Sequence, residues 1–192
     1  MTAEVHPLEP FLPANARLLM LGSFPPARSR WSMEFYYPNL QNDMWRIVGL
    51  VFYGDKEHFL TPDRRHFDRG RIETFCRERG IALSDTAVEV VRQRDNASDR
   101  FLEVTVRRDI RGLIERLPEC RAIVVTGQKA ADTLALELGC ALPKVGEGIA
   151  IECCGREMEL YRMPSSSRAY PLALDRKAEF YESMFRRIGI LG

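Results

Sequence analysis

The sequence predicts an α/β fold in which helices cover both faces of a mostly parallel sheet. Short apolar runs that end near a glycine or a polar residue alternate with amphipathic stretches that end at glycine or proline. This alternation is typical of parallel sheets. The length of 192 residues, with 45% hydrophobic and 29% charged residues, fits one globular domain of ordinary size. We therefore expect a single domain over residues 1–192.

The first elements follow residues 1–16, in which three prolines indicate an N-terminal tether. The apolar run RLLMLGS at 17–23 predicts a buried strand. Apolar residues near helical spacing predict a helix over 43–54. A threonine followed by proline at the start and a glycine at the end predict a second helix over 61–80.

The middle of the chain repeats the alternation of strand and helix. IALSDTAV at 81–88 predicts a second strand, and the polar stretch 92–100 predicts a loop. An amphipathic helix is expected over 106–118, where a proline stops it. RAIVVTG at 121–127 predicts a third buried strand, and the helix that follows over 128–139 ends at a glycine.

The C-terminal part is predicted to form a hairpin over 148–164 that turns at Gly155, followed by a helix over 174–189. In a parallel sheet the loops after the carboxyl ends of the strands share one edge, where ligands bind. The loops GSFPP, SDTAVE, VTGQK and MPSSSRAY should therefore meet at one rim. The segments richest in polar and aromatic groups converge there, so the sequence predicts its site at this rim.

Composition argues against several classes of protein. No apolar run approaches the roughly 20 residues of a membrane helix, and no signal peptide is evident, so we expect a cytoplasmic protein. The cysteines are odd in number without a C-x-x-C pair, and the histidines match no ligand spacing, so neither a disulfide scaffold nor a metal site is expected. The net charge of +1 argues neither for nor against binding to nucleic acid. Arginine outnumbers lysine, which suits phosphate binding, although a GC-rich genome produces the same bias.

The stretch GSFPPARSRWSMEFYYPNLQNDMW at 22–45 places two tyrosines and three amide side chains just after the first strand. A core does not need amides beside tyrosines, because buried amides require hydrogen-bond partners. A pocket for a flat polar ring uses both, since the aromatic ring stacks and the amide offers a donor and an acceptor. Neighbours on an extended segment face opposite ways, so we expect one of Tyr36 and Tyr37 in the core and the other in the pocket.

Five stretches match, in order, the pattern of one enzyme superfamily. LLMLGSFPPARS has a strand that leads into a Gly-x-x-Pro loop, and YYPNLQNDMW follows it. The second strand and its polar extension match GIALSDTAVEVVRQRDNASD. The central helix, strand and helix match RDIRGLIERLPECRAIVVTGQKAADTL. RMPSSSRAYPLALDRKAEFYESMF has a Pro-Ser-x-Ser loop that opens the last helix. The chain thus resembles the uracil-DNA glycosylase superfamily over most of residues 17–186, most closely the hypoxanthine-DNA and mismatch-specific uracil-DNA glycosylase branch.

The resemblance implies a three-layer α/β/α sandwich around a four-stranded, mostly parallel sheet. It implies a monofunctional DNA N-glycosylase of base excision repair. Such an enzyme flips a deaminated base, uracil or hypoxanthine, out of DNA and hydrolyses its N-glycosidic bond. The implied partner is DNA containing a damaged or mismatched base, with no cofactor, no metal and no membrane. We expect a monomer.

The resemblance also implies roles for individual residues. Tyr37 matches the aromatic residue that stacks on the base, and Asn42 matches the amide that contacts the base and supports catalysis. The residue type alone fits a helix N-cap at Asn42 equally well. The first loop, with Gly22, Ser23 and Phe24, is expected to line the base pocket.

Two positions depart from the pattern of many family members. Phe24 stands where many carry an Asp or Asn that activates water, and Met163 stands where some carry a histidine. The closest branch has apolar residues at both places. Catalysis would then depend on Asn42, backbone groups and stabilisation of charge. Asp85 could supply a carboxylate for the oxocarbenium-like state, but we favour a turn cap there.

The last loop is the expected DNA contact. Ser165, Ser166 and Ser167 could hold phosphates beside a helix N-terminus, or they could simply cap their own turn. Arg168 could enter the gap left by the flipped base or bind a phosphate. Three more cations on the rim could add phosphate contacts: Arg28, Arg30 and Lys129.

Two other functions stay open. Phe24 also fits a catalytically impaired protein of the same fold that binds damaged DNA or a nucleotide. A hydrolase of free nucleosides is the third hypothesis, and salt-dependent DNA affinity would argue against it.

Overall fold

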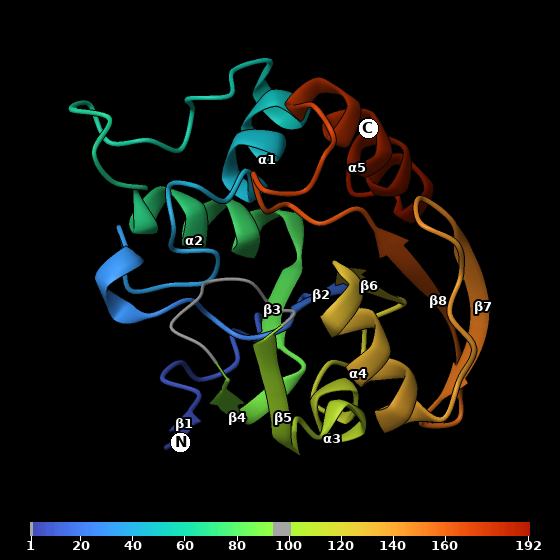
Figure 1. The fold of residues 1–192 in the computed structure, drawn as a ribbon. Helices are drawn as coiled ribbons and strands as arrows, with labels where there is room; N and C mark the ends of the chain where they lie inside the picture. The colour runs from blue at the N-terminus through green and yellow to red at the C-terminus, as the bar shows by residue number, and fades with distance from the viewer. Residues whose placement is uncertain (1, 94–100) are drawn as a thin grey trace.

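A mixed sheet runs through the middle of the molecule (Figure 1) in the computed structural model, which describes residues 2–93 and 101–192. Its strand order is β3-β2-β6-β8-β7. Strands β2 and β3 pair in parallel, as do β2 and β6, and β6 and β8, whereas β7 is antiparallel to β8. The strands are β2 (Leu18–Gly22), β3 (Ile81–Asp85), β6 (Ala122–Thr126), β7 (Gly148–Cys153) and β8 (Arg156–Met163).

The predicted α/β class is confirmed, but the sheet differs from the four-stranded one expected. Four strands are parallel, and the predicted hairpin adds β7 as a fifth strand at the edge. The hairpin turns at Cys154 and Gly155, whose φ angles are 55° and 67°. Two residues with positive φ are what a tight two-residue hairpin turn requires, so the turn makes β7 antiparallel.

Helices cover both faces of this sheet (Figure 1). Leu18 and Met20 of β2 join one core, and Leu19 and Leu21 join the other. Every residue of β2, β3 and β6 is buried for this reason. The first core lies under α1 (Met44–Tyr53), α2 (Arg69–Arg79) and α5 (Leu174–Ile188), and the second under α3 (Ile110–Glu115) and α4 (Gln128–Leu138).

A second sheet, with strand order β1-β4-β5, does not follow from the sequence patterns. It consists of β1 (Ala3–Val5), β4 (Ala87–Arg92) and β5 (Leu102–Arg107). β1 belongs to the segment expected as a tether, yet it pairs with β4. Phe11 N donates to Leu83 O over 2.9 Å. The N-terminal segment therefore packs against both sheets instead of forming a tether.

This second sheet shortens two predicted elements. The strand expected over 81–88 ends at Asp85, because the chain turns at Thr86 and enters β4. The helix expected over 106–118 is reduced to α3, because β5 occupies its start. Of the predicted loop 92–100, positions 94–100 lie outside the described residues.

The remaining helices follow the predictions closely, with one exception. Helices α1, α4 and α5 lie within one residue of the predicted bounds. Helix α2 starts at Arg69 rather than near Thr61, because the Asp68 side chain caps it by accepting a hydrogen bond from Arg71 N. No helix in the described ranges is both long enough and apolar enough to cross a membrane.

Candidate functional site

The loops at the carboxyl ends of the parallel strands enclose a cavity of about 930 Å³. This volume lies within the range of small-molecule pockets. All four loops predicted to meet at the rim contribute to its walls. The wall includes Gly22 at the end of β2, Asp85 at the end of β3, Thr126 at the end of β6 and Ser165 after β8.

Every residue assigned to the site from the sequence lines this cavity. Arg30 and Lys129 line it as well, whereas Arg28 pairs with Glu34 and lies over the Trp31 ring. The assigned residues are Gly22, Ser23, Phe24, Tyr37, Asn42, Ser165, Ser166, Ser167 and Arg168.

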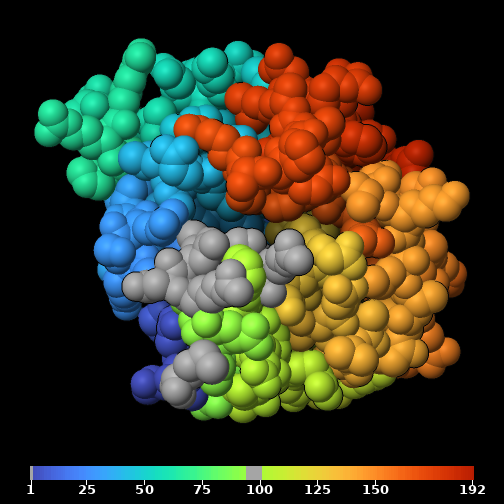
Figure 2. All heavy atoms as spheres, viewed as in Figure 1, coloured from blue at the N-terminus to red at the C-terminus, as the bar shows by residue number. Residues whose placement is uncertain are grey.

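The segments 22–45 and 163–170 meet directly, although more than a hundred residues separate them in the chain. Asn42 and Ser167 form an antiparallel bridge. Asp43 N donates to Ser166 O over 2.7 Å, and Arg168 N donates to Gln41 O over 3.1 Å. Figure 2 shows the orange-red atoms of the C-terminal part against the blue and cyan atoms of the first fifty residues. Backbone hydrogen bonds thus set the distance between the two loops.

A buried cluster of charges holds this junction. Lys177 of α5 is fully buried, and its Nζ lies 3.3 Å from Asp43 Oδ2 and 2.8 Å from Ser167 O. Arg168 Nε and Nη2 each lie 3.3 Å from Asp43 Oδ1. The sequence analysis missed Asp43 and Lys177. Lys177 could have been found, because it falls on the apolar face of the predicted helix beside Ala178 and Tyr181.

Arg168 is held against the protein rather than extended away from it. Besides Asp43, its guanidinium donates to Gln41 Oε1 over 3.1 Å and to Leu40 O over 3.2 Å. Its side chain is still 46% exposed. In this arrangement Arg168 closes the junction and keeps part of its side chain exposed, whereas filling a gap in DNA would require it to leave these partners.

The two adjacent tyrosines divide as predicted. Tyr36 is buried in the core, and its hydroxyl donates to Glu9 O over 2.9 Å. Burial raises the pKa of Tyr36, so it stays protonated. Tyr37 is half-buried in the wall of the cavity, and its hydroxyl lies 3.0 Å from Thr126 Oγ1. Its ring meets Trp45 edge to face at 6.1 Å.

Tyr37 adopts an unusual backbone conformation, with φ of 53°. A bulky side chain in the left-handed region costs of order 1–3 kcal/mol, and such residues cluster at functional sites. Trp45 Nε1 donates to the Tyr36 carbonyl oxygen over 3.0 Å, which fixes the peptide before Tyr37. The surrounding contacts therefore hold the Tyr37 ring in the cavity wall at a conformational cost.

Asn42 bonds to the start of α1 but is not its N-cap, which is Asp43. The Asn42 Oδ1 accepts a hydrogen bond from Met44 N, the first residue of α1, over 2.9 Å. The same side chain lines the cavity. Among residues 2–93 and 101–192 no partner is found for Nδ2, so the oxygen is used by the helix and the amide nitrogen keeps its donor capacity.

Asp85 does not cap a turn, contrary to the interpretation favoured above. Its Oδ2 lies 2.7 Å from Nε2 of His6, and both residues are buried. A Cβ atom added to Gly22 would lie 2.5 Å from Asp85 Oδ1, so the carboxylate packs against the end of β2. Asp85 also lines the cavity. The pair His6–Asp85 was missed because no local pattern marks a contact between residues so far apart in sequence.

Phe24 packs against one member of this pair. Phe24 is 8% exposed, and its ring meets the His6 ring edge to face, with the centroids 5.2 Å apart. Phe24 also packs with Ala87, Val90 and Leu102 of the second sheet. Asp85 itself still lines the cavity, whereas the Phe24 ring cannot position a water molecule.

The serine loop, residues 165–167, makes hydrogen bonds that cap its own turn, which was one of the two interpretations of its sequence. Ser165 Oγ accepts from Ser167 N over 3.2 Å, and Ser167 Oγ accepts from Ala169 N over 3.3 Å. Ser165 also lies against Gly127, at the uncapped start of α4. Met163, the last residue of β8, is buried in the core and takes no part in the cavity wall.

Comparison with known proteins gives two informative relatives. No family model matches the chain. It is 30% identical over 121 residues to a hypoxanthine DNA glycosylase of Methanosarcina acetivorans, which corresponds to 63% of this chain and 70% of the relative. The solution NMR structure of a candidate uracil DNA glycosylase from the same organism superposes with a TM-score of 0.64 and 24% identity, over 98% of this chain and 99% of the other. That structure shares the fold.

Proposed function

The chain belongs to the uracil-DNA glycosylase superfamily, in its hypoxanthine-DNA branch, and from this premise we propose that it excises uracil or hypoxanthine from DNA. The observation that carries the proposal is the convergence of Tyr37, Asn42 and the loop 165–168 on one cavity of about 930 Å³. We further propose that it acts as a single-domain monomer on DNA that contains a damaged base, inside the compartment that holds the DNA.

The extruded base would bind against Tyr37. Flipping costs a few kcal/mol, and stacking on an aromatic ring returns about 1–3 kcal/mol per base. The bond between the Tyr37 hydroxyl and Thr126 orients the ring before the base arrives. The Nδ2 group of Asn42 would donate to a carbonyl oxygen, which both uracil and hypoxanthine carry. Gly22 and Ser23 bring the backbone close to the base, because neither has a large side chain.

Hydrolysis would break the bond between C1′ and the base nitrogen and add a water oxygen to C1′, and the proton that the water loses would end on the departing base. The bonding electrons leave with the base, and positive charge develops on the sugar. Asn42 would stabilise the leaving base through its donor, as a preorganised dipole in the site. Asp85 would supply negative charge opposite the sugar. His6 would hold the Asp85 carboxylate in place, since the two side chains are bonded over 2.7 Å.

The decisive experiment is release of free base from duplexes that contain uracil or hypoxanthine. Two Asn42 variants separate its structural and chemical roles. Asn42→Asp keeps an oxygen that can accept from Met44 N, whereas Asn42→Ala loses both this acceptor and the donor. We expect both variants to lose excision at least 10-fold under single-turnover conditions, and only Asn42→Ala to lose stability, by about 1 kcal/mol.

The second candidate function is damaged-DNA binding without cleavage, which Phe24 favours because it replaces a polar group with an apolar ring. Tight binding to a damaged duplex with no base released by folded protein would establish this alternative and defeat the catalytic proposal. Release of base that is equal in wild type and both Asn42 variants would defeat the role of Asn42.

A further inference from the structure

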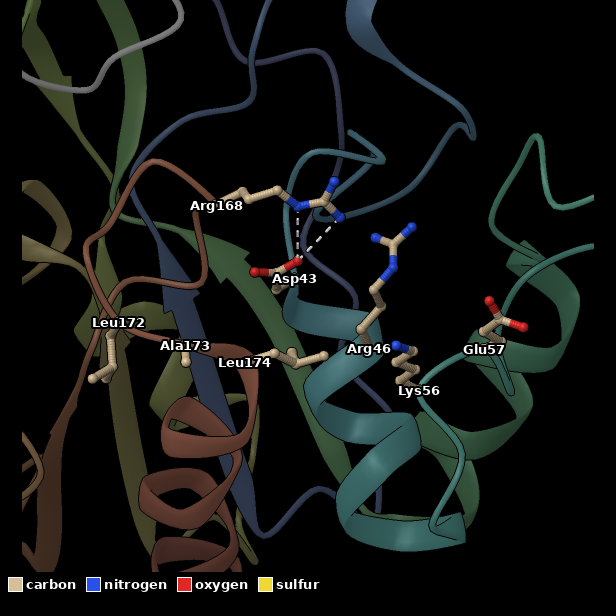
Figure 3. A pocket seen from close by; sticks show the side chains of 8 residues that line it. All are labelled: Asp43, Arg46, Lys56, Glu57, Arg168, Leu172, Ala173 and Leu174. Atoms are coloured by element: carbon tan, nitrogen blue, oxygen red, sulfur yellow. Dashed lines mark hydrogen bonds and ion pairs between the residues drawn. The ribbon is translucent and has the colours of Figure 1, made fainter.

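A second cavity, of about 420 Å³, lies at the junction between the two loops, where Asp43 and Arg168 line it (Figure 3). It shares Arg168 with the wall of the base cavity. Its wall also includes Arg46 of α1, Lys56 of the following loop, and Ala173 and Leu174 at the start of α5. The two carboxylates in this wall are Asp43 and Glu57.

Two guanidinium groups converge at this cavity. Arg46 Nη1 donates to Leu40 O over 2.7 Å, and Arg168 Nη2 donates to the same oxygen over 3.2 Å. Figure 3 shows the two groups beside each other, with Lys56 close to Arg46. Partial burial and then the neighbouring Arg168 lower the pKa of Arg46, although an arginine remains charged at neutral pH. Asp43 and Glu57 raise the pKa of Arg46 and so offset part of this effect, and an anion between the two guanidinium groups would further reduce their repulsion.

The carboxylates of the wall are already engaged by other cations. Asp43 pairs with Arg168 and with the buried Lys177, and Glu57 pairs with Arg64 over 2.9 Å. Within the described part of the chain, neither Arg46 nor Lys56 has a carboxylate within ion-pair distance. The cavity therefore has more positive charge than the protein neutralises.

The positions of these cations suit a tetrahedral anion. The Arg46 guanidinium lies over the Phe67 ring at 5.4 Å, which orients it without using a negative charge. Planar guanidinium groups donate in pairs to phosphate oxygens. The first turn of α5 adds a partial positive charge, because its N-cap Ala173 provides no side-chain bond to the free N–H groups. Asp175 in that turn offsets part of this contribution.

We propose that Arg46, Lys56 and Arg168 bind a backbone phosphate of the DNA strand beside the extruded nucleotide. This inference rests on the proposed function, because Arg168 is common to both cavities and an anion here would belong to the same strand as the flipped base. The site extends the DNA contact beyond the serine loop to α1 and to the loop that holds Lys56. It accounts for two cations that no carboxylate pairs with.

The test is the salt dependence of DNA binding. Fluorescence anisotropy measures affinity for a hypoxanthine duplex and for a matched undamaged duplex between 50 and 200 mM salt. Log K falls as log salt rises, and each lost phosphate contact should make this slope less steep by about 0.9. We expect this loss for Lys56→Gln and for Arg46→Gln, on both duplexes, and retention of the slope in Arg46→Lys. Lys144→Gln is the matched control, because Lys144 is exposed and lines neither cavity.

Three results would overturn the inference in distinguishable ways. If wild type binds DNA and the Lys56 and Arg46 variants keep the wild-type slope, the phosphate site is wrong and the proposed function survives. If inorganic phosphate stabilises wild type but neither variant, and DNA slopes are unchanged, the cavity holds a free anion instead. If wild type binds neither duplex, the proposed function fails together with this site. Circular dichroism melting checks that Arg46→Gln still folds, because this variant loses the hydrogen bond to Leu40 O. Lys56→Gln loses no such bond, because Lys56 is exposed.

Discussion

Replacement of Lys177 by methionine removes a buried cation that holds two loops of the site together. The ammonium group bonds to Asp43 Oδ2 and to Ser167 O, and the side chain is 0% exposed. Methionine keeps the length of the side chain, so little cavity forms. Among the described residues, Arg168 then remains as the cation paired with Asp43. The Ser167 carbonyl oxygen loses the hydrogen bond that it accepts from Lys177.

The expected loss of stability follows from this geometry. Removal of one partner of a buried ion pair costs about 3–5 kcal/mol, because the other charge stays buried without compensation. We expect about 3 kcal/mol, the lower end, since the partly exposed Arg168 still neutralises Asp43 in part. With an m-value of about 2 kcal/mol/M, the urea midpoint should fall by roughly 1.5 M.

Equilibrium urea unfolding followed by circular dichroism measures this change. The double variant Asp43→Asn with Lys177→Met should recover part of the loss, because the uncompensated carboxylate is gone. Lys144→Met, at an exposed position, is the control and should leave the midpoint unchanged. A loss below about 1 kcal/mol for Lys177→Met, or a double variant no more stable than the single one, would show that the pair does not hold the junction.

Three further predictions concern the walls of the base cavity. Gly22→Ala should displace the Asp85 carboxylate, since the new Cβ would lie 2.5 Å from Oδ1. We expect about 1–3 kcal/mol of destabilisation in urea unfolding and slower excision. Wild-type stability together with wild-type excision would contradict the close approach. His6→Phe should leave Asp85 buried without its partner and cost about 1–3 kcal/mol in the same assay, whereas an unchanged midpoint would mean that the pair contributes nothing. Tyr37→Phe loses the hydrogen bond to Thr126, worth about 1 kcal/mol, but keeps the aromatic ring. Tyr37→Ala also loses about 1–3 kcal/mol of stacking, so it should bind a damaged duplex more weakly than Tyr37→Phe. Equal affinities of the two variants would exclude stacking on Tyr37.

Local patterns in the sequence were sufficient for the central elements. The apolar runs at 17–23, 81–88 and 121–127 each contain a strand that is buried at every residue. Such strands are recognisable because helices on both faces require a continuous apolar run. The amphipathic spacing of 174–189 likewise located α5. The rim followed from the direction of parallel strands, so the predicted site residues came together without knowledge of any side-chain contact.

Edge strands and turns were beyond these patterns. β1 has three residues and β5 is largely exposed, so neither forms an apolar run that a sequence window detects. β1 pairs with β4, which is distant in sequence, whereas β5 pairs with β4 as the next strand along the chain. The proline-rich N-terminal segment therefore suggested a tether, although its backbone hydrogen bonds are satisfied by β4 and β3.

The sequence by itself determined the fold class, the rim and the residue types that surround the cavity, because periodicity and strand direction are local properties. Only the tertiary structure decided which polar side chains meet: Asp43 with Lys177, 134 residues apart, and His6 with Asp85, 79 residues apart. The same holds for the amide of Asn42, whose oxygen accepts a hydrogen bond from Met44 N and whose side chain lines the cavity. Hydrogen bonds and ion pairs act over a few ångströms, so their partners are fixed by how the whole chain packs and not by neighbours in the sequence.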